Sequence, residues 1–426
     1  MAQDDRERAL LAGVQLSGTS DEEESESMRE LGALADTAGA EVISEFIQRR
    51  STYDPATLIG SGRVDELKAS VSDSGATLVI FDAELSAGQQ DRLEKALGAR
   101  VVDRTSLILD IFARHAHTRE GSTQVELAQL SYLLPRIRGR GVEMSRIGGG
   151  IGTRRGPGEM KLEVDRRTIR RRMRKLERDL EQMESVRLTQ RKQRTRAGLT
   201  QISLVGYTNG GKSSLLNRLS GAHTLVGDKL FSTLDSTTRK IALPDGRSAV
   251  LSDTVGFIRK LPHELIAAFH STLEIVRDAD LLLHVIDSSA GEDMEERIKS
   301  VRLVLAELNA DAITTLDVFN KSDLMEPASL RAIALKHPGA LQVSAATGEG
   351  IDAMLEALAV KIGATALVSL VIPSARGELL ALLYREGRVV DVEHDGDETR
   401  VKVELPTNRL DDFRSFIRQR LPENGQ

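Results

Sequence analysis

The stretch Gln201-Ile-Ser-Leu-Val205-Gly206-Tyr-Thr-Asn-Gly-Gly211-Lys212-Ser213-Ser214 decides the fold of this chain. A short apolar run is followed by a glycine-rich loop, and a helical pattern starts at the end of that loop. Backbone N–H groups and a helix N-terminus can face a triphosphate here, because glycine puts no side chain in the way. The Lys212 ammonium is predicted to bridge the β- and γ-phosphates, and the Ser213 hydroxyl to bind Mg²⁺. This stretch predicts a nucleotide-binding α/β domain.

Four further polar motifs follow apolar runs and are predicted to lie where strands end. The run 249–252 ends in Asp253-Thr-Val-Gly256, whose carboxylate can hold Mg²⁺ through water and whose Gly256 N–H can contact the γ-phosphate. The run 281–286 ends at Asp287. Because ligands bind at the carboxyl ends of strands in an open α/β sheet, these motifs predict one shared site.

The other two motifs predict which base is bound. The run 315–319 ends in Asn320-Lys-Ser-Asp323, and the run 341–343 leads into Ser344-Ala-Ala346. The Asp323 carboxylate can accept two hydrogen bonds from the N1–H and the amino group of guanine, and adenine lacks this pair of donors. The backbone of Ser344–Ala346 can contact the base edge. The sequence therefore predicts GTP and GDP as ligands, with Mg²⁺.

Charge is distributed unevenly along the chain. The 426 residues carry a net charge of −6, but residues 136–196 hold 20 Lys and Arg against 8 Asp and Glu. That segment is at +12 and the remainder at −18, which favours a surface that binds a polyanion. Aromatic residues are 3% of the chain and Trp is absent, so RNA binding would depend on phosphate contacts from arginine. No cysteine is present, which excludes disulfides and thiol chemistry and suits the cytoplasm.

The part before the phosphate loop is predicted to form three units. Residues 1–27 are predicted to be an acidic disordered tail, and residues 28–120 a small parallel α/β domain. Residues 121–197 are predicted to form an antiparallel helical hairpin, with a Gly- and Arg-rich loop between its two helices. The candidate RNA contacts in this loop are Arg138, Arg140, Arg146, Arg154 and Arg155.

The part from the phosphate loop onward is predicted to form two domains. Residues 198–365 form a Rossmann-like P-loop domain, and residues 366–426 a small α+β domain with strands at 389–393 and 399–405 and a helix at 410–420. The fold class is therefore α/β, with the hairpin joined to the N-terminal domain. No apolar run is long enough to span a bilayer. We expect a monomeric cytoplasmic protein that associates peripherally with membranes or ribosomes.

The four boxes at Gly206–Ser213, Asp253–Gly256, Asn320–Asp323 and Ser344–Ala346 resemble those of translation-factor-related GTPases. The strings FSTLDSTTR, DTVGFIRKLPHEL and GGIGTRRGPGE resemble the HflX family of ribosome-associated GTPases. This resemblance implies GTP hydrolysis, binding to the large (50S) ribosomal subunit, splitting or rescue of stalled or idle ribosomes, and a hairpin loop that reaches the peptidyl-transferase region. It also implies that Thr233 is the switch threonine on Mg²⁺.

The predicted site residues are divided by role. Those predicted to act in catalysis are Lys212, Thr233 and Gly256, and those predicted to bind metal are Ser213 and Thr233. The predicted nucleotide contacts are Gly206, Tyr207, Thr208, Asn209, Gly210, Gly211, Lys212, Ser213, Ser214, Phe231, Ser232, Thr233, Leu234, Asp235, Asp253, Thr254, Val255, Gly256, Asn320, Lys321, Ser322, Asp323, Ser344, Ala345 and Ala346.

The residue after Gly256 is Phe257, where many GTPases have a glutamine that orients the attacking water. Phenylalanine cannot hydrogen-bond to water. We therefore predict slow intrinsic hydrolysis that the ribosome stimulates, by ordering the loops or by supplying the missing group. The alternative is that Phe257 anchors the loop while another group holds the water.

Two other functions stay open at this stage. One is a regulatory GTP/GDP switch that recruits a protein effector without touching RNA. The other is an additional ATP-dependent RNA enzyme in residues 28–196, although that part contains no second phosphate loop.

Overall fold

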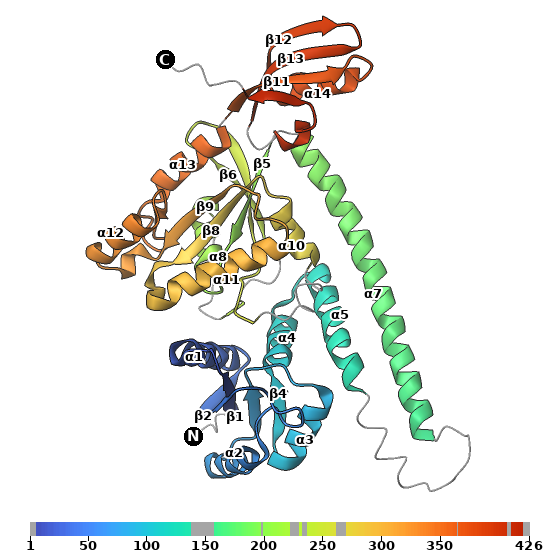
Figure 1. The fold of residues 1–426 in the computed structure, drawn as a ribbon, viewed down its shortest axis with the longest axis vertical. Helices are drawn as coiled ribbons and strands as arrows, with labels where there is room; N and C mark the ends of the chain where they lie inside the picture. The colour runs from blue at the N-terminus through green and yellow to red at the C-terminus, as the bar shows by residue number, and fades with distance from the viewer. Residues whose placement is uncertain are drawn as a thin grey trace.

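The computed structural model describes residues 6–137, 157–196, 199–221, 230–231, 237–260, 270–363, 365–406 and 410–420. Three sheets of 4, 6 and 4 strands organise these residues. In Figure 1 the first sheet lies at the bottom, the six-stranded sheet above it and the third sheet at the top, while the helix α7 (Pro157–Arg196) runs along the right-hand side.

The N-terminal domain is a parallel sheet with helices packed against it. Its strand order is β2-β1-β3-β4, and all neighbouring strands are parallel. Its elements are β1 (Glu7–Leu16), α1 (Asp21–Thr37), β2 (Ala40–Arg50), α2 (Ser61–Ser74), β3 (Leu78–Phe81), α3 (Ala87–Leu97), β4 (Arg100–Asp103) and α4 (Arg104–His115).

The prediction of a disordered tail in residues 1–27 is wrong for the part that the structure describes. Strand β1 lies inside the sheet, paired with both β2 and β3, and buries Ala9 to Ala12 completely or nearly so. The acidic run Asp21–Glu24 forms the first turn of α1, behind a capping box from Ser20. Carboxylates are stabilised at a helix N-terminus by the exposed N–H groups there, so this acidic run marks the start of a helix.

The predicted antiparallel hairpin is present, made of α5 (Arg119–Arg136) and α7. The two helices lie side by side in Figure 1. The Arg172 guanidinium makes a two-pronged ion pair with Glu126 at 2.6 Å, and Leu176 is buried in the contact. The loop between the helices, with Arg138, Arg140, Arg146, Arg154 and Arg155, lies outside the described residues.

The central domain is a six-stranded sheet in the order β10-β9-β8-β5-β7-β6. All neighbours are parallel except β6, which runs antiparallel to β7. Its elements are β5 (Thr200–Val205), α8 (Lys212–Ser220), β6 (Thr238–Ala242), β7 (Ser248–Asp253), α10 (His270–Arg277), β8 (Leu281–Asp287), α11 (Met294–Glu307), β9 (Thr315–Asn320), α12 (Pro327–Lys336), β10 (Leu341–Gln342) and α13 (Ile351–Gly363). After β5 the chain builds the sheet first on one side and then on the other, which opens a crevice at the carboxyl ends of the central strands.

The C-terminal domain is an antiparallel sheet in the order β12-β13-β11-β14 with one helix packed on it. Its elements are β11 (Thr365–Pro373), α14 (Gly377–Glu386), β12 (Arg388–Asp395), β13 (Glu398–Pro406) and β14 (Ile417–Arg420). The predicted helix at 410–420 is wrong. Residues Asp411–Phe413 form one short turn, and β14 then pairs with β11. The apolar spacing of Leu410, Phe413 and Phe416 resembles a helix, but the free edge of β11 offers backbone partners that a helix would leave unused.

Within the described residues, no helix has the length and apolarity needed to cross a membrane.

Candidate nucleotide site

The phosphate loop joins β5 to α8, and its glycines are required by close backbone approaches. Gly206 lies against β8, where a Cβ atom would be 2.3 Å from the carbonyl oxygen of Val285. Gly211 has a φ of 91°, and a Cβ there would be 2.1 Å from Asn320 Nδ2. Only glycine fits at these two points. The loop therefore lies tightly against the strands that carry the other motifs.

The Lys212 side chain is held by its own loop. Its Nζ donates hydrogen bonds to the carbonyl oxygens of Gly206 (3.1 Å) and Tyr207 (2.8 Å). An ammonium group has three donors, so one remains for a phosphate oxygen. Burial lowers the pKa of Lys212 from its usual 10.5 to about 8, although the Asp253 carboxylate opposes this shift. The charge is thus costly here until an anion arrives.

Ser213 and Asp253 bring two oxygen groups together at the start of α8. The Ser213 hydroxyl donates to Asp253 Oδ2 at 2.5 Å, and Asp253 is buried at the end of β7. Hydroxyl and carboxylate oxygens fit Mg²⁺, which takes its remaining ligands from water and substrate phosphates. The described residues contain no group of three or more His, Cys, Asp or Glu side chains that could hold a metal ion alone.

The motifs predicted to read the base meet on the other side of the loop. Asn320 Nδ2 donates to the Gly210 carbonyl oxygen at 3.0 Å, and its Oδ1 accepts from the Ala345 N–H at 3.0 Å. The Ser344 hydroxyl donates to Asp323 Oδ1 at 2.5 Å. Lys321 pairs with Asp287 at 2.6 Å. Residues from three separate strand ends therefore form one connected arrangement.

Phe257 holds the segment after Gly256 against the phosphate loop. It is 2% exposed, and its backbone is paired with the phosphate loop. Its N–H donates to the Gly206 carbonyl oxygen at 3.1 Å, and its carbonyl accepts from the Thr208 N–H at 2.8 Å. The residue after Gly256 therefore brings no polar side chain to the site.

Tyr207 and Phe231 direct their side chains toward the N-terminal domain. The Tyr207 hydroxyl donates to Glu30 of α1 and accepts from the Arg259 N–H at 2.8 Å. Burial, followed by the nearby Glu30 carboxylate, raises the pKa of Tyr207. The Phe231 ring packs edge-on against Phe112 of α4, with ring centroids 4.6 Å apart. Both residues were predicted as nucleotide contacts, and only their backbones remain available for that role.

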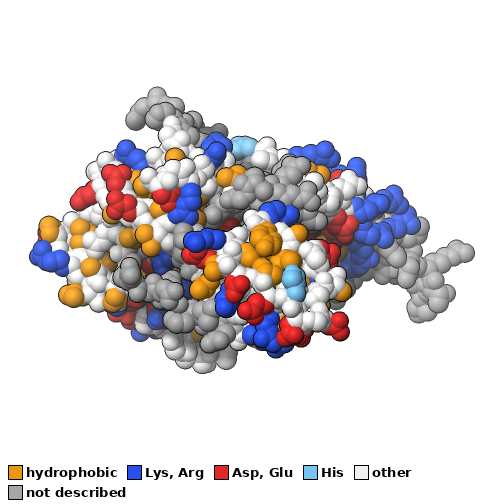
Figure 2. All heavy atoms as spheres, turned by 90° about the horizontal axis from the view of Figure 1, so that it is seen from above, with side chains coloured by type: hydrophobic (Ala, Val, Ile, Leu, Met, Phe, Trp, Pro, Cys, Tyr) orange, Lys and Arg blue, Asp and Glu red, His pale blue; other side chains and the backbone are white. Residues whose placement is uncertain are grey.

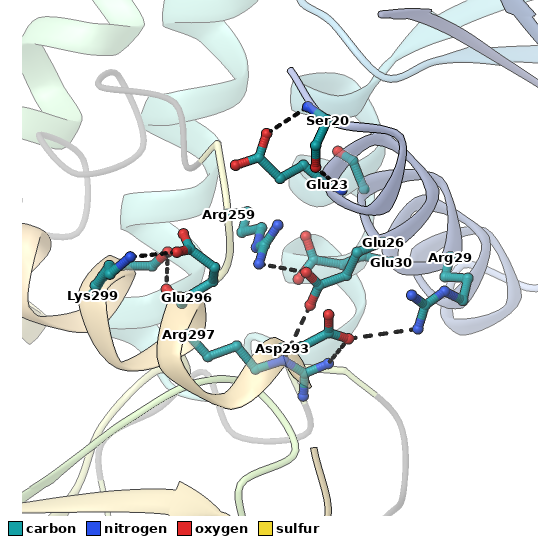
Figure 3. Close-up of polar contacts among 12 residues, drawn as sticks. Ser20, Glu23, Glu26, Arg29, Glu30, Arg259, Asp293, Glu296, Arg297 and Lys299 are labelled. Atoms are coloured by element: carbon teal, nitrogen blue, oxygen red, sulfur yellow. Dashed lines mark hydrogen bonds and ion pairs between the residues drawn. The ribbon is translucent and has the colours of Figure 1, made fainter. Parts of the chain in front are cut away.

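Charged side chains join the N-terminal and central domains (Figure 3). The Glu26 carboxylate pairs with Arg259 and, at 3.4 Å, with Arg297, and Arg29 lies 3.5 Å from Asp293. Burial raises the pKa of Glu26, and Arg259 counteracts part of this rise. These residues form a charged contact around the segment that follows Gly256.

Arg104 and Lys260 complete this contact, and both pair with the buried Asp82. Arg104, 2% exposed, pairs with Glu30 and with Asp82 at 2.8 Å, and it donates to the carbonyl oxygen of Arg259 at 3.1 Å. Lys260 pairs with Asp82 and donates to the Ser27 hydroxyl at 2.9 Å. None of these pairings was predicted from the sequence, because the partners lie 22 to 233 residues apart and no local pattern connects them.

Part of the predicted site lies outside the described residues, namely Ser232, Thr233, Leu234 and Asp235. The assignment of Thr233 to Mg²⁺ therefore stays a prediction.

Comparison with known proteins identifies relatives across the chain. Residues 25–113 match the family described as GTP-binding GTPase N-terminal, residues 115–194 the GTP-binding GTPase middle region, and residues 201–321 the 50S ribosome-binding GTPase family. A protein named GTPase HflX from Caldanaerobacter subterraneus subsp. tengcongensis is 47% identical over 97% of this chain and 94% of its own length. GTPase HflX from Escherichia coli is 40% identical over 97% of this chain and 96% of its own. A crystal structure of a GTP-binding protein from Sulfolobus solfataricus with GDP is 25% identical over 83% of this chain and 97% of its own, with a TM-score of 0.41.

Proposed function

The chain belongs to the HflX family of GTPases, and from this premise we propose that it uses GTP hydrolysis to control its binding to the large ribosomal subunit. We further propose that it splits or rescues stalled or idle ribosomes. The observation that supports the proposal is a phosphate loop bonded to the predicted base-reading motif, in the same chain as a long helix with exposed arginines.

The pocket explains how this chain prepares GTP for hydrolysis. Lys212, held by two carbonyls of its own loop, keeps a donor for the β- and γ-phosphates. Mg²⁺, held by Ser213 and through water by Asp253, would neutralise charge on the phosphates. The Asp323 carboxylate orients the guanine. These groups hold the substrate in position, and position together with charge stabilisation supplies most of the catalysis in phosphoryl transfer.

Phe257 cannot orient the water molecule that attacks the γ-phosphate. Its side chain is buried and apolar, so it can neither accept nor donate a proton. We propose that the bound ribosomal subunit orders the loops that hold the water, which makes hydrolysis slow in free protein and faster on the ribosome.

Helix α7 supplies the polyanion-binding surface in this proposal. Figure 2 shows Lys and Arg side chains gathered at the right-hand edge of the molecule, where α7 lies in Figure 1. Among the described side chains of this helix, the exposed basic residues are Arg167, Arg170, Arg171, Arg172, Arg174, Lys175 and Arg178. Guanidinium groups bind phosphate in a planar, two-pronged manner, which suits ribosomal RNA. The candidate contacts Arg138, Arg140, Arg146, Arg154 and Arg155 precede this helix, and rRNA near the peptidyl-transferase centre is their proposed partner.

Sedimentation with purified ribosomal subunits tests the proposal. We expect the protein to pellet with large subunits in a non-hydrolysable GTP analogue and to stay in the supernatant in GDP. Reversing two charges on α7, Arg171→Glu and Arg174→Glu, should weaken pelleting while GTP hydrolysis by free protein is unchanged. Arg331→Glu, an exposed arginine in α12, is the matched control and should behave as the wild type.

Salt dependence separates this function from that of a regulatory switch that recruits a protein effector without RNA. Contacts to phosphates release counterions, so affinity for the subunit should fall steeply as salt rises. If neither the α7 substitutions nor added salt changes the amount of protein that pellets with the subunit, the RNA contact is contradicted and the effector function is favoured.

A further inference from the structure

Arg218 lies in the last turn of α8, the helix that begins at Lys212 and Ser213. The side chain crosses to the loop Ser344–Ala346. Its Nε donates to the Ala345 carbonyl oxygen at 3.0 Å, and its Nη2 donates to the carbonyl oxygen of Ala346. One guanidinium therefore joins the helix behind the phosphates to the loop proposed to contact the base.

That loop is held from a second side by the base-reading motif. The Ala345 N–H donates to Asn320 Oδ1, and the Ser344 hydroxyl donates to Asp323. Arg218 binds the carbonyl oxygens of Ala345 and Ala346 in the same loop. The loop is thus fixed between two sets of hydrogen bonds, and only one set was visible in a sequence motif.

Peptide geometry gives the Arg218 contact a direct consequence for the ligand. In a planar trans peptide the C=O and the following N–H point in opposite directions, and the described chain contains no cis peptide bond. Fixing the carbonyl oxygen of Ala345 therefore fixes the direction of the Ala346 N–H. We infer that Arg218 is a positioning residue for guanine recognition, which aims the Ala346 N–H at the base edge and ties this loop to the phosphate helix. The inference rests on the base-contact role proposed for Ser344–Ala346.

The guanidinium of Arg218 can hold this loop in a way that a lysine side chain could only partly reproduce. A guanidinium has a permanent charge and presents several N–H groups in a fixed plane, so it can hold two neighbouring carbonyls at once. A lysine ammonium is a single point of charge. The position near the C-terminal end of α8 also favours a cation, because the unpaired carbonyls there carry partial negative charge.

Nucleotide release tests the inference on the full chain. We expect Arg218→Ala to release fluorescently labelled GDP about tenfold faster, because two hydrogen bonds that order the loop are lost. KM for GTP should rise by a similar factor, whereas kcat at saturating GTP should be unchanged, since no group on the transferred phosphate is removed. The rate of GDP release from Arg218→Lys should lie between those of the wild type and Arg218→Ala.

A matched control separates positioning from structural support. Arg247 is another arginine of the same domain, and it donates to the backbone carbonyl oxygen of Ala359, away from the base loop. Arg247→Ala should leave GDP release unchanged. Equal release rates for wild type and Arg218→Ala, or the same acceleration in Arg247→Ala, would overturn the inference.

The base site itself is tested separately with Asp323→Asn. If this variant loses its preference for guanine while Arg218→Ala behaves as the wild type, the base site stands and the role of Arg218 fails. If Asp323→Asn leaves GTP affinity unchanged, the base site fails, and the inference fails with it.

Discussion

The nucleotide pocket and the contact between the N-terminal and central domains use different kinds of interaction. In the pocket, backbone groups and a few buried side chains from contiguous motifs are already in place, as in the bonds from Lys212 to Gly206 and Tyr207. The domain contact is made of charged side chains that come from positions as distant as Glu26 and Arg297. The pocket is therefore fixed by local chain geometry, whereas the contact depends on two folded domains meeting.

The two regions share one segment. Phe257 is paired with the phosphate loop, and Arg259 and Lys260 reach the N-terminal domain. Lys260 also has a φ of 51°, in the left-handed region that non-glycine residues rarely adopt. The segment 257–260 therefore joins the phosphate loop directly to the charged contact between the two domains.

Removing Arg104 should have the largest effect, and it tests the buried ion pairs that Arg104 makes inside the N-terminal domain, beside its bond to the carbonyl oxygen of Arg259. Arg104→Met leaves the buried carboxylate of Asp82 without this partner, and breaking a buried pair costs about 3–5 kcal/mol. Urea denaturation should show this loss in the free energy of unfolding. Arg49→Met is the control, because Arg49 and Asp21 form an exposed pair, and exposed pairs contribute little to stability. Equal losses in both variants would contradict the importance of the buried ion pairs of Arg104.

Lys212→Ala should have the next largest effect, and it tests the pocket. The substitution removes the donor that the loop aims at the phosphates, so GTP hydrolysis should fall by about 10²- to 10³-fold. The measurement is phosphate release at saturating GTP, with circular dichroism as a check that the fold is retained. Hydrolysis within a factor of two of the wild type would show that another group neutralises the phosphates.

Asp323→Asn should have a smaller effect, confined to base selection. An amide offers N–H donors where the carboxylate accepts, so GTP affinity should fall about 10- to 100-fold. Xanthosine triphosphate, which has a carbonyl in place of the amino group of guanine, should bind better than it does to the wild type. Competition binding with both nucleotides checks this, and an unchanged order of preference would remove Asp323 from the base site.

Proton uptake should give the smallest effect. The pKa of Lys212 is about 8 in the free protein because of burial, and bound phosphates raise it. Binding of GDP should therefore take up about half a proton at pH 8 and almost none at pH 6, and affinity should fall as pH rises above 8. Calorimetry in two buffers of different ionisation enthalpy measures this uptake. The absence of uptake at pH 8 would contradict a buried, titrating Lys212.

The pocket and the domain contact also differ in how much of each could be predicted from the sequence. The order of strand, loop and helix around Lys212 follows from the pattern of neighbouring residues. The base-reading residues Asn320 and Asp323 likewise belong to one short motif. These could be placed at one edge of a sheet because parallel strands end together. The HflX family could be identified from the same strings of residues.

The features that could not be predicted from the sequence depend on contacts between distant parts of the chain. The acidic run at Asp21–Glu24 indicated disorder by composition, but its capping of α1 and the burial of β1 depend on the sheet around them. The run 410–420 has helical spacing, yet the edge of β11 decides its structure. The pairing of Arg104 with Glu30 and the bonds from Arg218 to Ala345 follow from tertiary packing alone.

We propose that the large ribosomal subunit completes a GTP site in which Phe257 supplies no water-orienting side chain. The most direct test is the rate of GTP turnover by the purified protein with and without large subunits. We expect slow turnover by the protein alone and a rate that rises with subunit concentration until it saturates. Equal rates in the two conditions would contradict completion of the site by the subunit.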